Sequence, residues 1–247
     1  MSANRQRSLV VLTGAGVSAD SGVPTFRDAG GLWEGHRVED VATPEAWARD
    51  PRAVWRFYQL RRAALRTVRP NAAHEALARL ERECSARGDR FTLISQNVDD
   101  LHERAGSTVL SMHGSLSHLA CESCGAVTRD TEHLDPHGFV ACGACGHEPL
   151  RPDVVWFGEL PRHLHEIDAA LRGATHFLSI GTSGAVYPAA GLLSAARSLG
   201  AETWVNSLDA PQNLDPRDRF LPGRAVEVVP VLVERLLADG RADRARD

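Results

Sequence analysis

The chain contains no lysine, and its 28 basic residues, all arginine, stand against 32 acidic residues. Codon usage in a GC-rich genome is the simplest explanation of this bias. A basic run is also missing and the formal net charge is −4, so neither nucleic acid nor an anionic membrane is expected as the main partner. No stretch approaches the roughly 18 apolar residues of a membrane span, and the polar N-terminus leaves no room for a signal peptide. We therefore expect a cytoplasmic protein.

Cysteine is scarce too, but four of the five cysteines have a regular spacing. Cys84 stands alone in a predicted helix, while the others form two Cys-x-x-Cys pairs separated by seventeen residues: Cys121 and Cys124, then Cys142 and Cys145. In a cytoplasmic chain this arrangement favours metal over disulfides. Four thiolates complete a tetrahedral shell with no open position, so a bound Zn²⁺ would be structural. Redox pairs and free thiols are the alternatives.

Short apolar runs alternate with segments of helical period along most of the chain. Strands are predicted at 9–12, 91–95, 108–111, 176–180, 203–206 and 225–229. Helices are predicted at 71–84, 162–171, 188–199 and 231–237. Such alternation is typical of a doubly wound, Rossmann-like parallel sheet in an α/β protein, which binds ligands at the carboxyl ends of its strands.

Two stretches interrupt the alternation. Residues 37–69 are helical with no strand, and residues 119–149 hold the paired cysteines and many glycines. We expect these two stretches to form a smaller domain, helical plus zinc ribbon. The Rossmann-like domain would then consist of residues 1–36, 70–118 and 150–247.

A glycine-rich string follows the first predicted strand. It begins Gly14-Ala15-Gly16-Val-Ser18 and ends Phe26-Arg27-Asp28. Glycines let the backbone approach a pyrophosphate, and the N-terminus of the following helix offers free N–H groups. The bare Gly-x-Gly fits a plain strand-to-helix turn equally well.

Polar residues also follow two other predicted strands. Gln96, Asn97 and Asp99 come after strand 91–95, where they can bond ribose hydroxyls and a carboxamide. A helix cap is the simpler explanation of that turn. His113 follows strand 108–111 and can serve as a general base, although a lone histidine is more often structural.

These strings, in this order, resemble the sirtuin family. The resemblance rests on the string from Gly14 to Asp28, on Gln96-Asn-Val-Asp99, on the His113-Gly114 pair and on the four-cysteine module, and it extends over about residues 9–233. Two departures lie beside the second string: Ser95 where the family mostly has threonine, and Asp100 where many members have glycine. The resemblance implies NAD as co-substrate and one structural zinc.

The resemblance also implies roles for individual residues. His113 would be the base, with Asn97 and Asp99 catalytic in the nicotinamide pocket. NAD would be bound by Gly14, Ala15, Gly16, Ser18, Phe26, Arg27, Trp33, Gln96, Asn97, Asp99, Gly181, Thr182, Ser183, Asn206 and Ala225. Acyl-lysine proteins or peptides would add a strand beside the segment that holds Val154, Trp156 and Phe157, the walls of the acyl-lysine tunnel.

One pair of residues bears on the acyl group. Tyr58 and Arg61 lie three residues apart on a predicted helix and so share a face. A guanidinium fork fits a carboxylate, and a phenol adds a hydrogen bond. By pattern alone, a solvated Arg61 and a core Tyr58 would be expected. Tyr-x-x-Arg and Ala42 together, however, resemble the class III sirtuins, which remove succinyl, malonyl and glutaryl groups.

The implied activity is that of an NAD-dependent protein-lysine deacylase releasing nicotinamide and O-acyl-ADP-ribose. A mono-ADP-ribosyltransferase using the same site is one alternative, and a non-catalytic module that senses NAD or binds a partner is another. The region between the first and last paired cysteines has one arginine, Arg129, against four acidic residues, which argues against nucleic acid. A lysine-processing enzyme without lysine could not modify itself. We expect a monomer.

Overall fold

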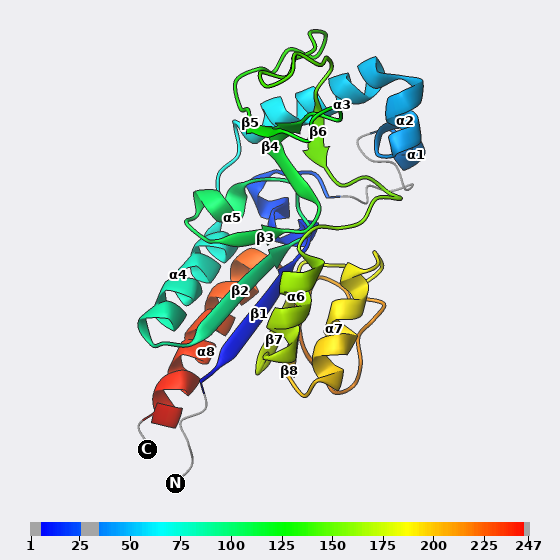
Figure 1. Ribbon diagram of the computed structural model, residues 1–247. Coiled ribbons are helices and arrows are strands. Elements are labelled where there is room, and N and C mark those ends of the chain that lie inside the picture. Colours follow the sequence, from blue (N-terminus) through cyan, green and yellow to red (C-terminus); the bar gives the residue numbers. More distant parts are fainter. Residues whose placement is uncertain (1–5, 26–34, 245–247) are drawn as a thin grey trace.

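A six-stranded parallel sheet forms the centre of the larger part of the molecule (Figure 1). The computed structural model describes residues 6–25 and 35–244. The strand order is β3–β2–β1–β7–β8–β9, and all neighbouring strands are parallel. The strands are β1 (Ser8–Thr13), β2 (Arg90–Ser95), β3 (Val109–Ser111), β7 (His176–Ile180), β8 (Glu202–Ser207) and β9 (Arg219–Pro222).

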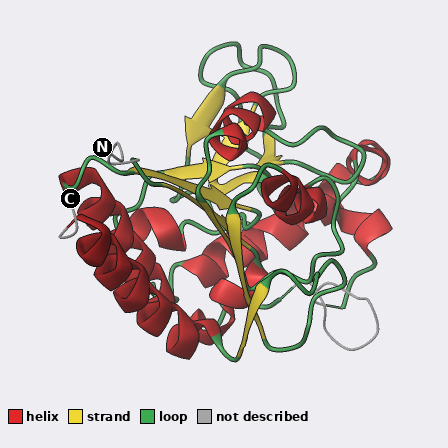
Figure 2. Cartoon of the chain, turned by 90° about the horizontal axis from the view of Figure 1, so that it is seen from below, coloured by secondary structure: helices red, strands yellow, loops and turns green. Residues whose placement is uncertain are grey.

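Helices cover both faces of this sheet (Figure 2). Helices α4 (Ala72–Ala86) and α8 (Ala225–Arg244) share one hydrophobic cluster with the strands. Helices α6 (Leu164–Arg172) and α7 (Ala189–Ser198) share another. The doubly wound Rossmann-like sheet predicted from the alternating pattern is therefore confirmed.

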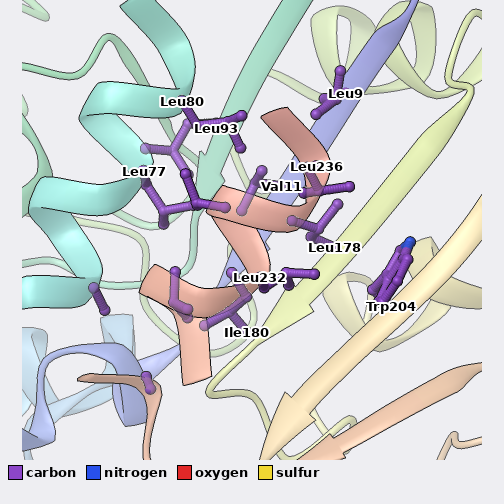
Figure 3. Packing of buried hydrophobic residues seen from close by; sticks show 14 of the residues in the cluster. Leu9, Val11, Leu77, Leu80, Leu93, Leu178, Ile180, Trp204, Leu232 and Leu236 are labelled. Atoms are coloured by element: carbon purple, nitrogen blue, oxygen red, sulfur yellow. The ribbon is translucent and has the colours of Figure 1, made fainter. Parts of the chain in front are cut away.

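Strand β1 supplies side chains to both clusters, as expected of a strand buried on its two faces. Leu9 and Val11 point to the α4–α8 side, and Val10 and Leu12 to the other. Figure 3 shows how apolar residues from the strands and from α4 and α8 meet on the first side: Leu9, Val11, Leu77, Leu80, Leu93, Leu178, Ile180, Leu232 and Leu236. Each such side chain contributes about 1.5–3 kcal/mol when fully buried.

The strand predicted at 225–229 is wrong, because these residues begin helix α8. The valine-rich run suggested a strand, yet its buried members Ala225, Val229, Leu232, Val233 and Leu236 recur with a helical period. The last strand of the sheet is β9, a short, partly exposed segment that ends in Pro222.

A smaller antiparallel sheet lies beyond the carboxyl ends of the parallel strands (Figure 1). Its order is β5–β4–β6, with β4 (Gly114–Ala120), β5 (Val127–Arg129) and β6 (Arg151–Val154). Helices α1 (Val38–Val41), α2 (Pro44–Arg49) and α3 (Pro51–Leu65) pack with it around an aromatic core. Strand β6 thus pairs within the smaller sheet, and the division of the chain into domains stays a prediction.

Three short helical segments complete the described chain: η1 (Ala15–Val17), η2 (Ala19–Ser21) and α5 (Leu101–Arg104). Over residues 6–25 and 35–244, no helix combines the length and apolar character that crossing a membrane requires.

Candidate active site

Three adjoining cavities lie at the carboxyl edge of the parallel sheet. The first has a volume of about 570 Å³, the second about 120 Å³ and the third about 190 Å³. Gln96 lines all three, and His113 lines the first and the third. The strand-end positions selected from the sequence therefore converge on one region.

The first cavity is formed by loops that follow β1, β2, β7 and β8. Ten of the residues predicted to bind a dinucleotide line it: Gly14, Ala15, Gly16, Gln96, Asn97, Gly181, Thr182, Ser183, Asn206 and Ala225. Ala225 lines it from the start of α8 instead of from a strand end. Because the carboxyl ends of parallel strands meet at one edge, segments far apart in sequence share this cavity.

Glycine is required here for close packing of two loops. A Cβ on Gly14 would lie 2.8 Å from the Gly181 carbonyl oxygen, and a Cβ on Gly16 would lie 2.8 Å from the Gly181 Cα. The glycine-rich string predicts that these glycines let the backbone approach a pyrophosphate. Their first structural effect is to let the loop after β1 contact the loop after β7.

Asn206 presents a polar atom that suits a ligand. The residue is 2% exposed, and its Nδ2 donates to the carbonyl oxygens of Leu221 (2.9 Å) and Gly223 (3.0 Å). Its Oδ1 is buried and has no hydrogen-bond partner within the described part of the chain. A buried acceptor without a partner is costly, so a hydroxyl or amino donor from a dinucleotide in the first cavity would stabilise it.

Asn97 and Asp99 line the second cavity together with Arg61 and Ala15. The Asn97 Nδ2 donates to the Gly14 carbonyl oxygen and to Ser18 Oγ, both at 3.2 Å. Burial raises the pKa of Asp99, against the effect of hydrogen bonds from the Leu101 N–H and from Ser18. The polar groups of this small cavity are thus held in fixed positions.

A buried histidine that the sequence analysis did not select supports this arrangement. The Asn71 N–H donates to His74 Nδ1 (3.3 Å), and burial lowers the pKa of His74 to about 4. The neutral ring therefore has its proton on Nε2, which donates to Ser18 Oγ (3.3 Å). Ser18 accepts from His74 and Asn97, so its own proton is directed to Asp99. The Asn-x-x-His spacing at the start of a helix was the available signal.

His113 has the geometry of a general base. Its Nδ1 lies 2.8 Å from the Gln96 carbonyl oxygen, which can only accept, so Nδ1 is the protonated nitrogen. Burial lowers the pKa of His113, which favours the neutral ring. Nε2 then has a free lone pair, at the boundary of the first and third cavities.

The third cavity holds most of the residues predicted for the acyl group: Ala42, Tyr58, Val154, Trp156 and Phe157. Arg61 is 8% exposed, which excludes the alternative of a solvated Arg61, whereas Tyr58 is 1% exposed and belongs to a hydrophobic core cluster, as the other half of that alternative expected. The two lie one turn apart on α3, but Arg61 lines the second cavity instead of the third. Arg61 therefore lines the same pocket as Asp99, one helical turn from Tyr58, whose phenol it still influences electrostatically.

Helix α3 is fixed beneath these cavities by the next residue, Arg62. Its Nε donates to the Leu116 carbonyl oxygen (2.9 Å), and its Nη2 lies 3.1 Å from Asp130 Oδ1. Both partners belong to the region of the smaller sheet. A buried arginine in this position anchors the helix that presents Tyr58 and Arg61.

The four paired cysteines come together at the far end of the smaller sheet. Their sulfur atoms all lie within 4.8 Å of one another. The Cys121–Cys145 and Cys124–Cys142 sulfur distances are 3.6 and 3.7 Å. A tetrahedral zinc with Zn–S bonds of about 2.3 Å places its sulfurs about 3.8 Å apart. The four side chains thus fit a structural zinc.

Comparison with known proteins decides the family. The sequence model of the Sir2 family matches residues 14–188, most of the chain. The chain belongs to the Sir2 family. The sirtuin resemblance inferred from the motifs is confirmed.

Two relatives and one structure show how far the similarity extends. The chain is 50% identical over 230 residues to an NAD-dependent protein deacylase of Caulobacter vibrioides, covering 92% of this chain and 96% of that protein. It is 48% identical over 233 residues to the NAD-dependent protein deacylase SIR2rp3 of Trypanosoma brucei brucei, covering 93% and 94%. A crystal structure of a Sir2 homolog–NAD complex superposes with a TM-score of 0.85 at 38% identity, covering 96% and 92%.

Three residues selected from the sequence, Phe26, Arg27 and Trp33, lie outside the described residues of this Sir2-family chain. The predicted cofactors, NAD and a structural zinc, agree with the family, with the first cavity and with the cysteine cluster. The role of each single residue stays a prediction.

Proposed function

We propose that this Sir2-family chain is an NAD-dependent protein-lysine deacylase whose acyl pocket accepts acidic groups such as succinyl and malonyl. One observation supports the proposal most directly: the His113 imidazole lies where the dinucleotide-sized first cavity meets the third cavity. A base in that position can act on a group from either side. A module that only bound NAD would have no need of it.

His113 would take a proton from a ribose hydroxyl through Nε2, while Nδ1 keeps its bond to the Gln96 carbonyl. When bound, NAD supplies the reactive ribose carbon from which nicotinamide leaves. The protein contributes position and a neutral imidazole. Asn206 would hold the adenosine half through its buried Oδ1.

Asn97 and Asp99 would hold the nicotinamide in the second cavity. Their support comes from Ser18, which contacts both side chains and is itself fixed by His74. Because each group in this chain of hydrogen bonds has a defined donor and acceptor, the amide and the carboxylate are presented in one orientation.

An acylated lysine from a protein or peptide would enter the third cavity past Phe157, which is half-exposed at the cavity wall. The named relatives are protein deacylases, which supports a protein substrate. Strand addition beside the segment after β6 is the expected mode, since it recognises backbone more than sequence. A monomeric state and a cytoplasmic location stay predictions.

The preference for acidic acyl groups rests on Tyr58 and Arg61. Tyr58 lines the acyl cavity, and the neighbouring Arg61 opposes the rise in the Tyr58 pKa that burial causes, so the two groups interact. A carboxylate at the end of the acyl chain would meet a cation and a phenol. Hydrogen bonds to a charged group contribute about 1.5–3 kcal/mol each.

A peptide panel tests the proposal. Purified zinc-loaded protein is incubated with NAD and matched acetyl-, succinyl- and malonyl-lysine peptides, and the products are identified by mass spectrometry. We expect nicotinamide, free lysine peptide and O-acyl-ADP-ribose. Arg61→Met should reduce kcat/KM for the succinyl peptide by roughly 10- to 100-fold while changing the acetyl reaction much less.

The exposed Arg56→Met on the same helix serves as the matched control and should leave both reactions unchanged. An equal loss of desuccinylation and deacetylation in Arg61→Met would refute the acidic-acyl assignment. ADP-ribose transferred to protein without free acyl product would instead identify a mono-ADP-ribosyltransferase.

A further inference from the structure

Arg151, on strand β6, connects the zinc-binding end of the molecule to the wall of the acyl cavity. Its guanidinium carbon lies 3.5 Å from the centroid of the Trp156 ring, so the two planar groups stack. Its side chain is only 12% exposed. This arginine belongs to none of the motifs that define the site, and the deacylation chemistry described above does not use it.

Three acceptors hold the Arg151 guanidinium in place. Nη1 and Nη2 donate to the two carboxylate oxygens of Glu159 at 2.8 and 2.9 Å, and Nη2 also donates to the Val154 carbonyl oxygen at 3.0 Å. Glu122, between the first two cysteines, lies 3.5 Å from Nη1. Glu159 in turn accepts the Trp156 backbone N–H at 2.7 Å. The N–H groups at the edge of the Arg151 guanidinium are thus hydrogen-bonded, and one face of the guanidinium packs on the Trp156 indole.

The stacked indole makes a specific contact with the acyl-binding tyrosine. Trp156 Nε1 donates to the Tyr58 hydroxyl oxygen at 3.0 Å. Because the indole N–H can only donate, the tyrosine oxygen is the acceptor, and the phenolic proton is directed away from the indole. Burial raises the pKa of Tyr58 well above its usual range, so that proton is retained.

We infer that Arg151 is a positioning residue for acyl specificity, which holds Trp156 so that the Tyr58 hydroxyl is oriented as a donor toward an acidic acyl group. The inference rests on the proposed function and deepens it. A lysine at this position would keep the charge but lose both the planar fork and the stack.

Two variants test the positioning role by kinetics. Trp156→Phe keeps an aromatic wall and removes the N–H, whereas Arg151→Lys keeps the charge and removes the stack. Each should lower the ratio of succinyl to acetyl kcat/KM by about threefold to tenfold, the effect of one hydrogen bond. The double variant should lower it no further, since both changes act on the same contact.

Arg197→Lys is the matched control. Arg197 is similarly buried, with a 10% exposed side chain, its bonds to Asp218 are 2.7–2.9 Å, and it does not line the third cavity. The ratio should not change in this variant. If Arg151→Lys lowered both activities equally, or if the double variant multiplied the effects, the positioning role would be wrong.

A measurement without substrate separates this inference from the proposed function. The chain has five tryptophans, so ¹⁵N-labelled protein gives few indole signals, and the one lost in Trp156→Phe is assigned. That signal should shift in Arg151→Lys and in Tyr58→Phe but not in Arg197→Lys. An unmoved signal in Arg151→Lys overturns the positioning role alone. A wild-type protein that fails to desuccinylate overturns the proposed acyl preference, whatever the indole does.

Discussion

The first and third cavities differ in what they are made of. The first is bounded by glycine loops and short polar side chains at the ends of β1, β2, β7 and β8. The third is bounded by aromatic side chains such as Tyr58, Trp156 and Phe157, from α3 and the segment after β6. One ligand site depends on the edge of a sheet, and the other on side chains packed across distant segments.

This difference has a consequence for robustness. The parallel sheet has its own hydrophobic clusters on both faces, and neither cluster includes any of the four paired cysteines. Residues that line the third cavity, such as Tyr58 and Trp156, belong to the same hydrophobic cluster as Cys121 and Cys142. A disturbance of the metal should therefore affect the acyl side first, while a change at His113, between the two cavities, should affect both.

The largest effect is expected for His113→Ala. Loss of the base should lower kcat for every acyl peptide by about 10²–10⁴-fold. Binding of ADP-ribose, measured by calorimetry, should change little, because the first cavity keeps its other walls. Substantial deacylation in this variant would show that the boundary between the cavities is not where the proton is taken.

The second-largest effect is expected for removal of the metal, which should weaken ligand binding in the third cavity more than in the first. After chelation, or in Cys142→Ser, zinc content should fall from one per chain, and affinity for an acylated peptide should fall by more than about tenfold. ADP-ribose affinity should stay within about threefold, because the sheet retains its own core. Equal losses of both affinities would mean that the two parts fold as one unit.

A smaller effect, confined to the first cavity, is expected for Asn206→Ala. Removing one acceptor should weaken NAD binding by about threefold to tenfold. The succinyl-to-acetyl ratio should not change, because Asn206 does not line the third cavity. A change in that ratio would break the proposed separation of roles.

The mildest effect comes from pH. Burial lowers the pKa of His113 below the ordinary histidine value of about 6.5, so the base is neutral at pH 7. The kcat/KM should be flat from alkaline pH down to neutrality and should decline only as acidification reaches the lowered pKa. Circular dichroism at each pH would control for unfolding. A decline beginning above neutrality would contradict the assignment of His113.

Most of the first cavity could be predicted because its determinants are local in sequence. Gly14 and Gln96 directly follow β1 and β2, and Asn97 and His113 lie two residues beyond the ends of β2 and β3. The carboxyl ends of parallel strands meet at one edge. The metal site could be predicted equally well, since two Cys-x-x-Cys pairs at that spacing specify a metal site.

The remaining features of the site could not be predicted from the sequence, because they depend on contacts between residues far apart in the chain. The Ser18–His74 bond joins residues 56 positions apart, and the stack of Arg151 on Trp156 depends on how the segment after β6 turns back. No periodicity encodes such contacts. The start of helix α8 is predicted as a strand because valine favours strands in general, whereas burial against α4 makes it helical here.

The proposed function requires that the first and third cavities act together through the His113 imidazole. The most direct test measures nicotinamide and free lysine peptide together, for zinc-loaded protein given NAD with and without one acylated peptide. The account predicts that both products form in equal amounts, and only when NAD and the acylated peptide are both present. Nicotinamide released at the same rate without the peptide, or never released with any acylated peptide, would contradict it.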